Sequence, residues 1–346
     1  MKSLAVVAPN QIELIEQPEP TVSRLSVVVA VAGCGVCGSD LPLYRQVTRI
    51  EDVGFFGHEF SGTIVSVGEG VDDLHVGERV ASGLIRTCGH CEKCLSGHPN
   101  YCPDMKTALS PGGFAQFTRV TENPDFGFLT TIPDHVTWER ATLHEPLSCA
   151  IRIIEQAGVK LGDRVVVLGL GTLGLLSGLL AQKSGASVVI GVDIQPGRLA
   201  LAHQVGINAI ARTDSDWKRN LDNALSSEFA DIVIETTGSV SGFADALALA
   251  RLGGCVVVGS VYHHLANEFD LRPMMRKELL VVGAKGPFPH KTRGKESLAM
   301  EIIASATLPL DALIKVYPAS QAQQAFEDTV AGKVGKAVVC FDEASR

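Results

Sequence analysis

The sequence feature that most constrains the fold is a glycine-rich turn that joins an apolar run to a helix-like segment. The run Arg-Val-Val-Val-Leu at 164–168 leads into Gly-Leu-Gly-Thr-Leu-Gly at 169–174, and the next apolar run ends at Asp193. Glycines so placed allow a tight turn, let a ligand approach the backbone, and bring helix and sheet close together. The pattern predicts a parallel sheet that binds a dinucleotide. The alternative is a structural turn in a nucleotide-free α/β protein.

The residues around this turn also predict how a dinucleotide would be bound. A helix that begins at the turn directs unpaired N–H groups and positive partial charge toward a pyrophosphate. Asp193 would accept hydrogen bonds from the adenosine ribose and repel a 2′-phosphate, so NAD is favoured over NADP, although the nearby Arg198 weakens that preference. The predicted cofactor-binding residues are Gly169, Gly171, Thr172, Leu173, Gly174, Asp193 and Arg198.

The region that contains the turn is predicted to be a doubly wound parallel sheet of the α/β class. From about residue 150, nearly continuous apolar runs alternate with amphipathic segments, as in parallel strands that helices cover on both faces. The expected strands lie at 165–168, 187–193, 209–210, 231–235, 255–258 and 279–282. One expected helix follows the glycine turn and ends at residue 184, and three more span 196–205, 216–226 and 241–251.

The residues before this region have a different pattern of apolar and turn-forming residues. They contain short β-rich runs separated by Gly, Pro and Asp turns, which predicts an irregular, mostly antiparallel β domain. The clearest runs lie at 26–31, 62–67 and 78–82. The tail from about residue 294 predicts a helix, a second helix at 321–330 and a final strand at 337–341. A length of 346 residues suits two domains of ordinary size.

Composition excludes several classes of partner. Lys and Arg number 30 against 38 Asp and Glu, a net charge of −8, so no general affinity for nucleic acid or an anionic membrane is expected. Residues 165–182 carry no charge, but their glycines indicate strand, turn and helix rather than a membrane span. The first residues lack a basic region followed by an apolar core, so no signal peptide is predicted and a cytoplasmic location is expected.

Four of the nine cysteines are crowded into one segment with the spacing C-x2-C-x2-C-x7-C. Four thiolates so spaced can converge on one ion and leave no open coordination position, which predicts a structural zinc. An iron–sulfur cluster is the alternative. His90 and His98 lie in the same loop and are expected to be solvated rather than to replace a sulfur. The predicted ligands are Cys88, Cys91, Cys94 and Cys102.

A second set of metal-ligating residue types is spread over three segments. Cys37 lies in Gly-Val-Cys-Gly-Ser-Asp, His58 and Glu59 in Gly-His-Glu-Phe-Ser-Gly, and Glu145 in His-Glu-Pro-Leu-Ser. Each residue alone is consistent with an ordinary core or surface position. Six motifs occur in family order: the Cys37 segment, the His58–Glu59 segment, the cysteine loop, the Glu145 segment, the glycine turn and Val-Val-Ile-Gly-Val-Asp-Ile at 188–194. Together they make the chain resemble the zinc-dependent medium-chain alcohol and polyol dehydrogenases over essentially its whole length.

The resemblance implies a fold and a division into domains. Members of this family combine a GroES-like β domain with a Rossmann domain inserted into it, and their active site lies in the cleft. By this resemblance, residues 1–150 and 294–346 form the GroES-like catalytic domain with two zinc sites. Residues 151–293 form the Rossmann NAD-binding domain.

The resemblance also implies a catalytic zinc. Cys37 and His58 look like two of its ligands, and Glu59 and Glu145 look like the carboxylate positions that coordinate it directly, through water or in exchange. Two carboxylates bound together would lower the metal's Lewis acidity, so we expect them to alternate while the fourth position stays open for substrate.

The proton route departs from that of the better-known alcohol dehydrogenases. Ser39 matches the hydroxyl that accepts the alcohol proton in family members. Pro42 stands where those enzymes carry a relay histidine, and a proline cannot titrate. The remaining candidates for the exit route are Glu59, Glu145, His144 and ordered water.

The expected activity is hydride transfer between a polyol or other secondary alcohol and NAD. The chain resembles the sorbitol-type and threonine-type branch, and the segments 37–42 and 71–75 look most like galactitol-1-phosphate dehydrogenases. A threonine-type or simple secondary alcohol dehydrogenase is an alternative, as is a sugar-alcohol phosphate dehydrogenase. A phosphorylated substrate would need basic groups, for which the candidates are Arg45, Arg49, Lys285 and Arg293.

Three other classes remain as rivals. A zinc-free quinone or enone reductase would lack the ligand set, and a non-catalytic NAD-binding protein would need only the glycines and Asp193. A nucleic-acid-binding zinc protein would need a basic face around its cysteine loop. In this loop and beside it, the positive charge of Lys93 is outweighed by the negative charges of Glu92 and Asp104. The expected partner is therefore a small-molecule alcohol, and the family habit implies a homodimer or homotetramer.

Overall fold

A computed structural model describes residues 1–46, 56–83, 87–103, 109–110, 112–121, 129–262, 269–286 and 297–341. The chain divides into two compact units. The first unit comprises Met1–Glu145 and Pro287–Arg346, and the second unit comprises Pro146–Gly286. Helix α5 (His144–Ala157) spans the first division, close to the boundary expected at residue 150.

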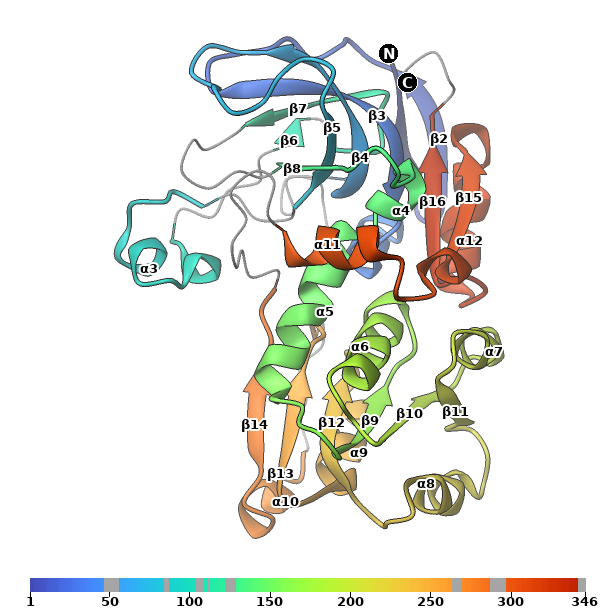
Figure 1. Cartoon of the computed structure of the whole chain (residues 1–346). Helices are drawn as coiled ribbons and strands as arrows, with labels where there is room; N and C mark the ends of the chain where they lie inside the picture. Colours follow the sequence, from blue (N-terminus) through green and yellow to red (C-terminus); the bar gives the residue numbers. More distant parts are fainter. Residues whose placement is uncertain are drawn as a thin grey trace. The chain divides into compact units, whose positions relative to one another are not determined.

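The first unit is built around one long strand, β3 (Ser26–Gly35), of which every residue is buried. It pairs antiparallel with β4 (Glu59–Val67), β7 (Phe117–Thr121) and β16 (Lys336–Cys340). The remaining strands of the sheet are β5 (Arg79–Ser82), β6 (Leu109–Ser110), β8 (Leu129–Thr131) and β15 (Ile314–Pro318). The main order is β15-β16-β3-β4-β5-β8, so segments far apart in the sequence share one sheet (Figure 1).

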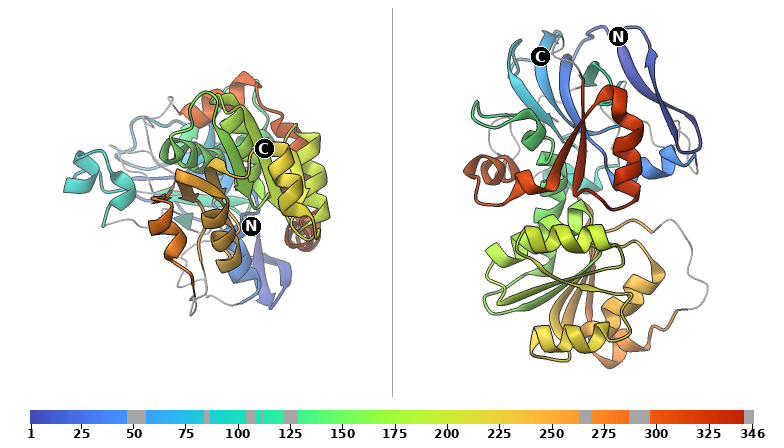
Figure 2. Two further views of the ribbon diagram at one scale, coloured as in Figure 1. Left: turned by 90° about the horizontal axis from the view of Figure 1, so that it is seen from below. Right: turned by 90° about the vertical axis from the view of Figure 1, so that its right-hand side faces the viewer.

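The rest of the first unit packs around this sheet. A separate hairpin joins β1 (Lys2–Ala8) to β2 (Gln11–Glu16). The helical elements are η1 (Gly38–Asp40), α1 (Leu41–Tyr44), α3 (Glu92–Leu95), η2 (Pro99–Tyr101), α4 (Trp138–Ala141), α11 (Leu298–Ser305), η3 (Leu310–Leu313), η4 (Ala319–Gln321) and α12 (Ala322–Val330). Helix α12 lies beside β16 (Figure 2, right). Its Phe326 packs against Tyr44, Phe56 and Phe114 with ring centroids 5.2–5.7 Å apart.

The second unit contains a six-stranded parallel sheet. Its strands are β9 (Arg164–Leu168), β10 (Val188–Asp193), β11 (Asn208–Ala211), β12 (Ala230–Glu235), β13 (Ala250–Val258) and β14 (Leu280–Gly283). They follow the order β11-β10-β9-β12-β13-β14, which can be traced from β14 to β11 in Figure 1. The order reverses between β9 and β12, the point at which doubly wound sheets bind ligands. The predicted parallel sheet is confirmed.

Helices cover both faces of this sheet. They are α6 (Thr172–Lys183), α7 (Pro196–Gln204), α8 (Trp217–Leu225), α9 (Val240–Leu249) and the short α10 (Arg272–Arg276). Leu221 of α8 and Leu247 of α9 share one hydrophobic cluster with Ile190 of β10. A Cβ on Gly178 of α6 would instead meet Val189 of the same strand at 3.7 Å. Since neighbouring strand residues point to opposite faces, α6 lies on the other side.

Two elements differ from those expected. The helix expected to reach residue 251 ends at Leu249, because Lys277 Nζ donates to the carbonyls of Leu247, Ala248 and Ala250 and β13 begins at once. Helix α5 was not among the expected helices. Among the described residues, no helix is both long and apolar enough to cross a membrane.

Candidate metal and cofactor sites

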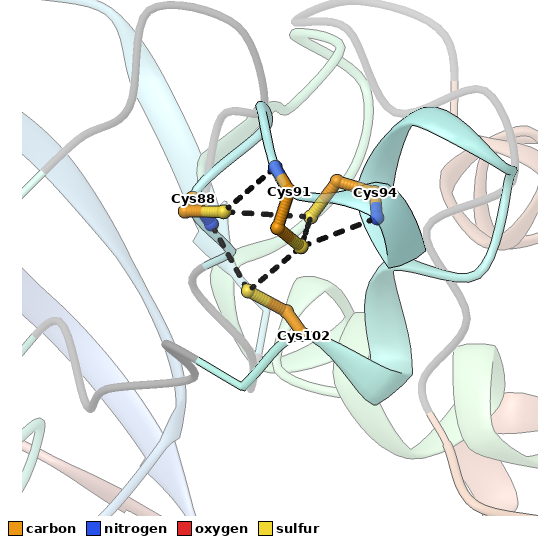
Figure 3. Close-up of side chains that lie close together, drawn as sticks. All are labelled: Cys88, Cys91, Cys94 and Cys102. Carbon is orange, nitrogen blue, oxygen red and sulfur yellow. Dashed lines mark hydrogen bonds between the residues drawn. The ribbon is translucent and has the colours of Figure 1, made fainter.

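The four cysteines expected to bind structural zinc converge in the structure (Figure 3). Cys91 Sγ lies 3.5 Å from Cys94 Sγ and 3.9 Å from Cys102 Sγ. Cys88 Sγ lies 3.9 Å from Cys94 Sγ. Four sulfurs at the usual zinc–sulfur distance in a tetrahedron lie about 3.8 Å from one another. The donor set and its spacing therefore fit one zinc ion.

Backbone N–H groups of this loop stabilise a thiolate at Cys88, whereas burial and hydrogen bonds with the other sulfurs raise the pKa of the Cys94 thiol. The N–H of Cys91 donates to Cys88 Sγ at 3.3 Å, and the N–H of Cys94 donates to Cys91 Sγ at 3.4 Å. Desolvation raises the pKa of the Cys88 thiol, but hydrogen bonds from backbone groups of His90 and Cys91 outweigh it and lower the pKa to about 6. A thiolate is the form that binds metal. The exposed His90 ring instead bonds the Cys88 carbonyl at 2.8 Å, and neither His90 nor His98 joins the sulfur cluster.

A second cluster forms where β3 ends and β4 begins. The pairing of Gly35 with Glu59 places the first residue of β4 beside the turn that carries Cys37. The ligand atoms of Cys37, His58 and Glu59 all lie within 4.8 Å of one another. Glu59 Oε1 is buried and has no hydrogen-bond partner in the described structure. A buried, unpartnered carboxylate oxygen is costly, so this atom fits a metal ligand well.

Negative charge accumulates around this cluster. Buried Asp40 accepts hydrogen bonds from the N–H groups of Cys37 at 2.9 Å and Gly57 at 3.2 Å, and its Oδ1 lies 3.8 Å from His58 Nδ1. Burial lowers the pKa of His58, but the negative charges of Cys37, Asp40 and Glu145 outweigh burial and raise the pKa to about 10. The surroundings therefore favour a cation. Glu145 contributes charge but lies outside the cluster of three ligand atoms.

One cation at this site was not identified from the sequence. Lys336, at the start of β16, is buried and its Nζ bonds Glu59 Oε2 and, at 3.1 Å, the carbonyl of Val36. Gly35 makes room for the pair, since a Cβ there would lie 2.5 Å from Glu59 Oε2 and 3.0 Å from Lys336 Cδ. No local pattern marks this lysine, because its partner is 277 residues away in the sequence.

The residues expected to move the proton have distinct surroundings. Ser39 is exposed on η1, and Pro42 lies in the first turn of α1. His144 is buried, with Nδ1 2.9 Å from the Ser82 carbonyl and Nε2 2.7 Å from Ser297 Oγ. Burial lowers the pKa of His144, which disfavours its charged form. The Ser82 carbonyl can only accept a hydrogen bond and cannot pass a proton on, so the contact at Nδ1 disfavours a relay through His144.

The glycine turn has the geometry of a phosphate-binding loop. Gly169 has φ +88°, a conformation that side chains rarely adopt. A Cβ on Gly174 would lie 1.9 Å from the Gly169 carbonyl oxygen, so helix and turn approach closely. The space beside Gly171 is open, and no side chain caps the helix that begins at Thr172. A pyrophosphate fits this open helix N-terminus.

Asp193 ends β10 next to this turn. Its carboxylate accepts hydrogen bonds from the N–H of Leu170 at 2.6 Å and the N–H of Gln195 at 2.8 Å. Arg198, in α7, lies 3.5 Å from Asp193 Oδ2. Thr172 and Leu173 occupy the first turn of α6. The turn and the aspartate are thus held together by the backbone.

Replacing Lys336 tests the buried ion pair. Lys336→Met leaves the Glu59 carboxylate buried without its cation, and we expect the free energy of unfolding of the metal-free protein to fall by about 3–5 kcal/mol. Urea unfolding at pH 7 measures the change. The control Lys333→Met removes an exposed lysine from Asp328, which keeps Lys315 as a partner, and should cost no more than about 1 kcal/mol. Equal losses in the two variants would contradict the assigned role of Lys336.

Family models match segments of both units of the chain. The alcohol dehydrogenase GroES-like domain matches residues 23–134, and the zinc-binding dehydrogenase domain matches residues 172–301. A probable D-xylulose reductase A of Aspergillus terreus is 33% identical, over 97% of this chain and 96% of the relative. The sorbitol dehydrogenase of Bacillus subtilis is 30% identical, over 94% of this chain and 93% of the relative.

A solved structure supports the same assignment. The crystal structure of galactitol-1-phosphate dehydrogenase from Escherichia coli matches with a TM-score of 0.83 and 26% identity, over 98% of this chain and all of that chain (100%). Sequence and fold therefore agree over nearly the full length. The chain belongs to the zinc-dependent medium-chain alcohol and polyol dehydrogenase family.

Proposed function

We propose that this protein transfers hydride between a secondary hydroxyl of a polyol and NAD with the help of a catalytic zinc. The cluster of Cys37, His58 and Glu59 carries the proposal, because a sulfur, an imidazole and a carboxylate converge there. One oxygen of that carboxylate, Glu59 Oε1, has no hydrogen-bond partner among the described residues. Three such ligands leave a fourth zinc position for a substrate oxygen. The names of the sorbitol and xylulose relatives support a polyol substrate.

The two glutamates are proposed to have different duties at this site. Zinc bound here would polarise the alcohol oxygen and lower its pKa. Lys336 holds Oε2 of Glu59, so Oε1 is the oxygen available to the metal. Glu145 lies outside the cluster, which supports a role as the carboxylate that exchanges with Glu59 rather than a permanent ligand.

Ser39 is proposed to accept the alcohol proton, since it is exposed and lies two residues after Cys37. Pro42 cannot pass that proton on, and the Nδ1 partner of His144 is a backbone carbonyl, which cannot relay a proton. The exit route is therefore proposed to use ordered water or one of the two glutamates.

The glycine turn is proposed as the cofactor site of the second unit. Gly169, Gly171 and Gly174 would receive the pyrophosphate at the start of α6, with Thr172 and Leu173 in the same turn. Asp193 is proposed to bind the adenosine ribose, with Arg198 beside it, and its negative charge supports a preference for NAD over NADP. A second zinc is proposed to hold the cysteine loop closed.

A phosphorylated polyol is a second candidate substrate. The similarity to an enzyme named for galactitol 1-phosphate favours it. Among the basic candidates, Arg45 and Lys285 lie in described segments, whereas Arg49 and Arg293 lie outside the described residues. The acidic Asp104 near the cysteine loop also lies outside them.

We also propose that the protein forms a homodimer or homotetramer in the cytoplasm. Strand β14 is the last strand of its sheet, and Leu280 at its start is 59% exposed. An open apolar sheet edge is suited to pairing with a second copy. None of the nine cysteines, all in described segments, forms a disulfide, which is consistent with a reducing compartment.

A substrate screen tests the proposed reaction. The zinc-loaded protein should reduce NAD with polyols or polyol phosphates faster than with threonine or simple secondary alcohols, and should prefer NAD to NADP. Absorbance at the wavelength of the reduced nicotinamide measures both. A strong NADP preference would contradict the role of Asp193. If the protein oxidised none of these alcohols, the proposed activity would be wrong.

Replacing Cys37 tests the catalytic zinc. Cys37→Ser should lower bound zinc from two ions to one per chain and lower kcat by more than about a hundredfold. That loss exceeds the decrease usually caused by replacing a residue that only hydrogen-bonds to a metal ligand. Metal analysis and circular dichroism separate ligand loss from unfolding. Cys255→Ala, in β13 of the second unit, is the matched control and should keep both ions. Full activity in Cys37→Ser would refute the ligand assignment.

Replacing a loop cysteine should have a different effect. Cys94→Ser should also lose one zinc, but we expect a lower unfolding temperature and faster proteolysis of the 88–102 loop, because metal binding there stabilises the folded loop. His90→Ala removes an exposed side chain of the same loop and should change neither zinc content nor stability. Unchanged proteolysis in Cys94→Ser would contradict a structural zinc.

A further inference from the structure

The carboxylate of Glu235 is buried at the carboxyl end of β12, with an exposed fraction of 0%. It bonds to the N–H of Thr237 at 2.7 Å and to the Thr237 hydroxyl. It also bonds to Ser260 Oγ at 2.6 Å and to the Tyr262 hydroxyl at 2.5 Å. One carboxylate thus ties the segment after β12 to the segment after β13.

The partners of Glu235 are those of an ionised carboxylate. An ionised carboxyl group only accepts hydrogen bonds, and the backbone N–H and three hydroxyls around it can all donate. Burial and the Glu235 charge raise the pKa of Tyr262, so its O–H remains a donor. Within the part of the chain that the structure describes, no basic side chain forms an ion pair with Glu235. A buried negative charge is therefore fixed here without a cation.

The surroundings hold this charge in one position. A Cβ on Gly242 would lie 2.2 Å from Thr237 Oγ1 and 3.0 Å from Glu235 Oε1, so a glycine leaves the space that the network fills. Thr236, the next residue, donates from Oγ1 to the carbonyls of Leu168 at 3.0 Å and Gly169 at 2.8 Å. Glu235 is thereby connected to the glycine turn across the reversal in strand order.

The topology indicates which end of a dinucleotide lies nearest. A doubly wound sheet of this order consists of two mononucleotide-binding halves that meet at the reversal. The half formed by β9, β10 and β11 carries the glycine turn and Asp193, which serve the pyrophosphate and the adenosine ribose. The half that begins with β12 then serves the nicotinamide end. Glu235 is the last residue of that strand.

We propose that Glu235 sets the redox-state preference of the cofactor site, its fixed negative charge favouring the positively charged ring of NAD⁺ over the neutral ring of NADH. The inference rests on the NAD site proposed above. A unit charge acting over roughly 10 Å through an effective dielectric constant of about 20 changes a binding constant by roughly tenfold. Glu235 thus acts as a specificity-determining residue that favours binding of the oxidised cofactor.

Two substitutions of Glu235 separate charge from shape. Glu235→Gln keeps the shape and removes the charge, and the ratio of the NAD⁺ Kd to the NADH Kd should rise about 3- to 10-fold. Glu235→Asp keeps the charge and shortens the reach, so both Kd values should rise while their ratio stays within about twofold of wild type. Titration calorimetry on the zinc-loaded protein measures all Kd values, and circular dichroism confirms folding.

The controls keep the charge and remove one donor each. Tyr262→Phe and Ser260→Ala should leave the Kd ratio within about twofold of wild type, and they remain informative if Glu235→Gln folds poorly. A several-fold change of the ratio in these controls, or parallel changes of both Kd values in Glu235→Gln, overturns the inference. A wild-type protein that binds neither form of the cofactor refutes the NAD site itself, so the two failures are distinguishable.

Discussion

The first unit depends on a concentration of buried negative charge that cations must balance. Glu59 and Asp40 are almost fully buried beside Cys37, and Lys336, together with His58 while no metal is bound, supplies the positive charge within the chain. Removing a carboxylate from water is costly unless it is paired. This requirement explains several features together. β16 must present Lys336 to β4, β3 must carry a glycine opposite Glu59, and one carboxylate oxygen remains for a metal.

The second unit meets the same problem in another way. Glu235 is as deeply buried as Glu59, but hydroxyls and a backbone N–H surround it in place of a lysine. Neutral donors stabilise an anion without cancelling its charge, so its field extends to whatever binds nearby. An ion pair such as that of Glu59 and Lys336 leaves a much smaller field. The difference is chemically reasonable if one site must hold a metal cation and the other must receive a cationic ring.

The sequence was most informative where interacting residues lie close together in the chain. The glycine turn and the four-cysteine loop were recognised from local spacing, and the order of strands and helices followed from apolar periodicity. Lys336 was missed because its partner is 277 residues away and a lone lysine before a strand has no special pattern. The end of α9 was misplaced because a distant lysine, Lys277, caps it. Helix α5 was missed altogether because it lies where the chain passes from β-rich to helical sequence.

The arrangement of β16 has a consequence for biosynthesis. The second unit is one continuous stretch of chain, Pro146–Gly286, and all its strands are available once that stretch has left the ribosome. The second unit interrupts the first unit in the sequence, so the central strand β3 can pair with β16 only after the second unit has been synthesised. A nascent chain can therefore complete its parallel sheet before Lys336 is synthesised. The charge of Glu59 is balanced within the chain only when the last strand arrives, so the first unit reaches its final electrostatic state after the second unit has been made.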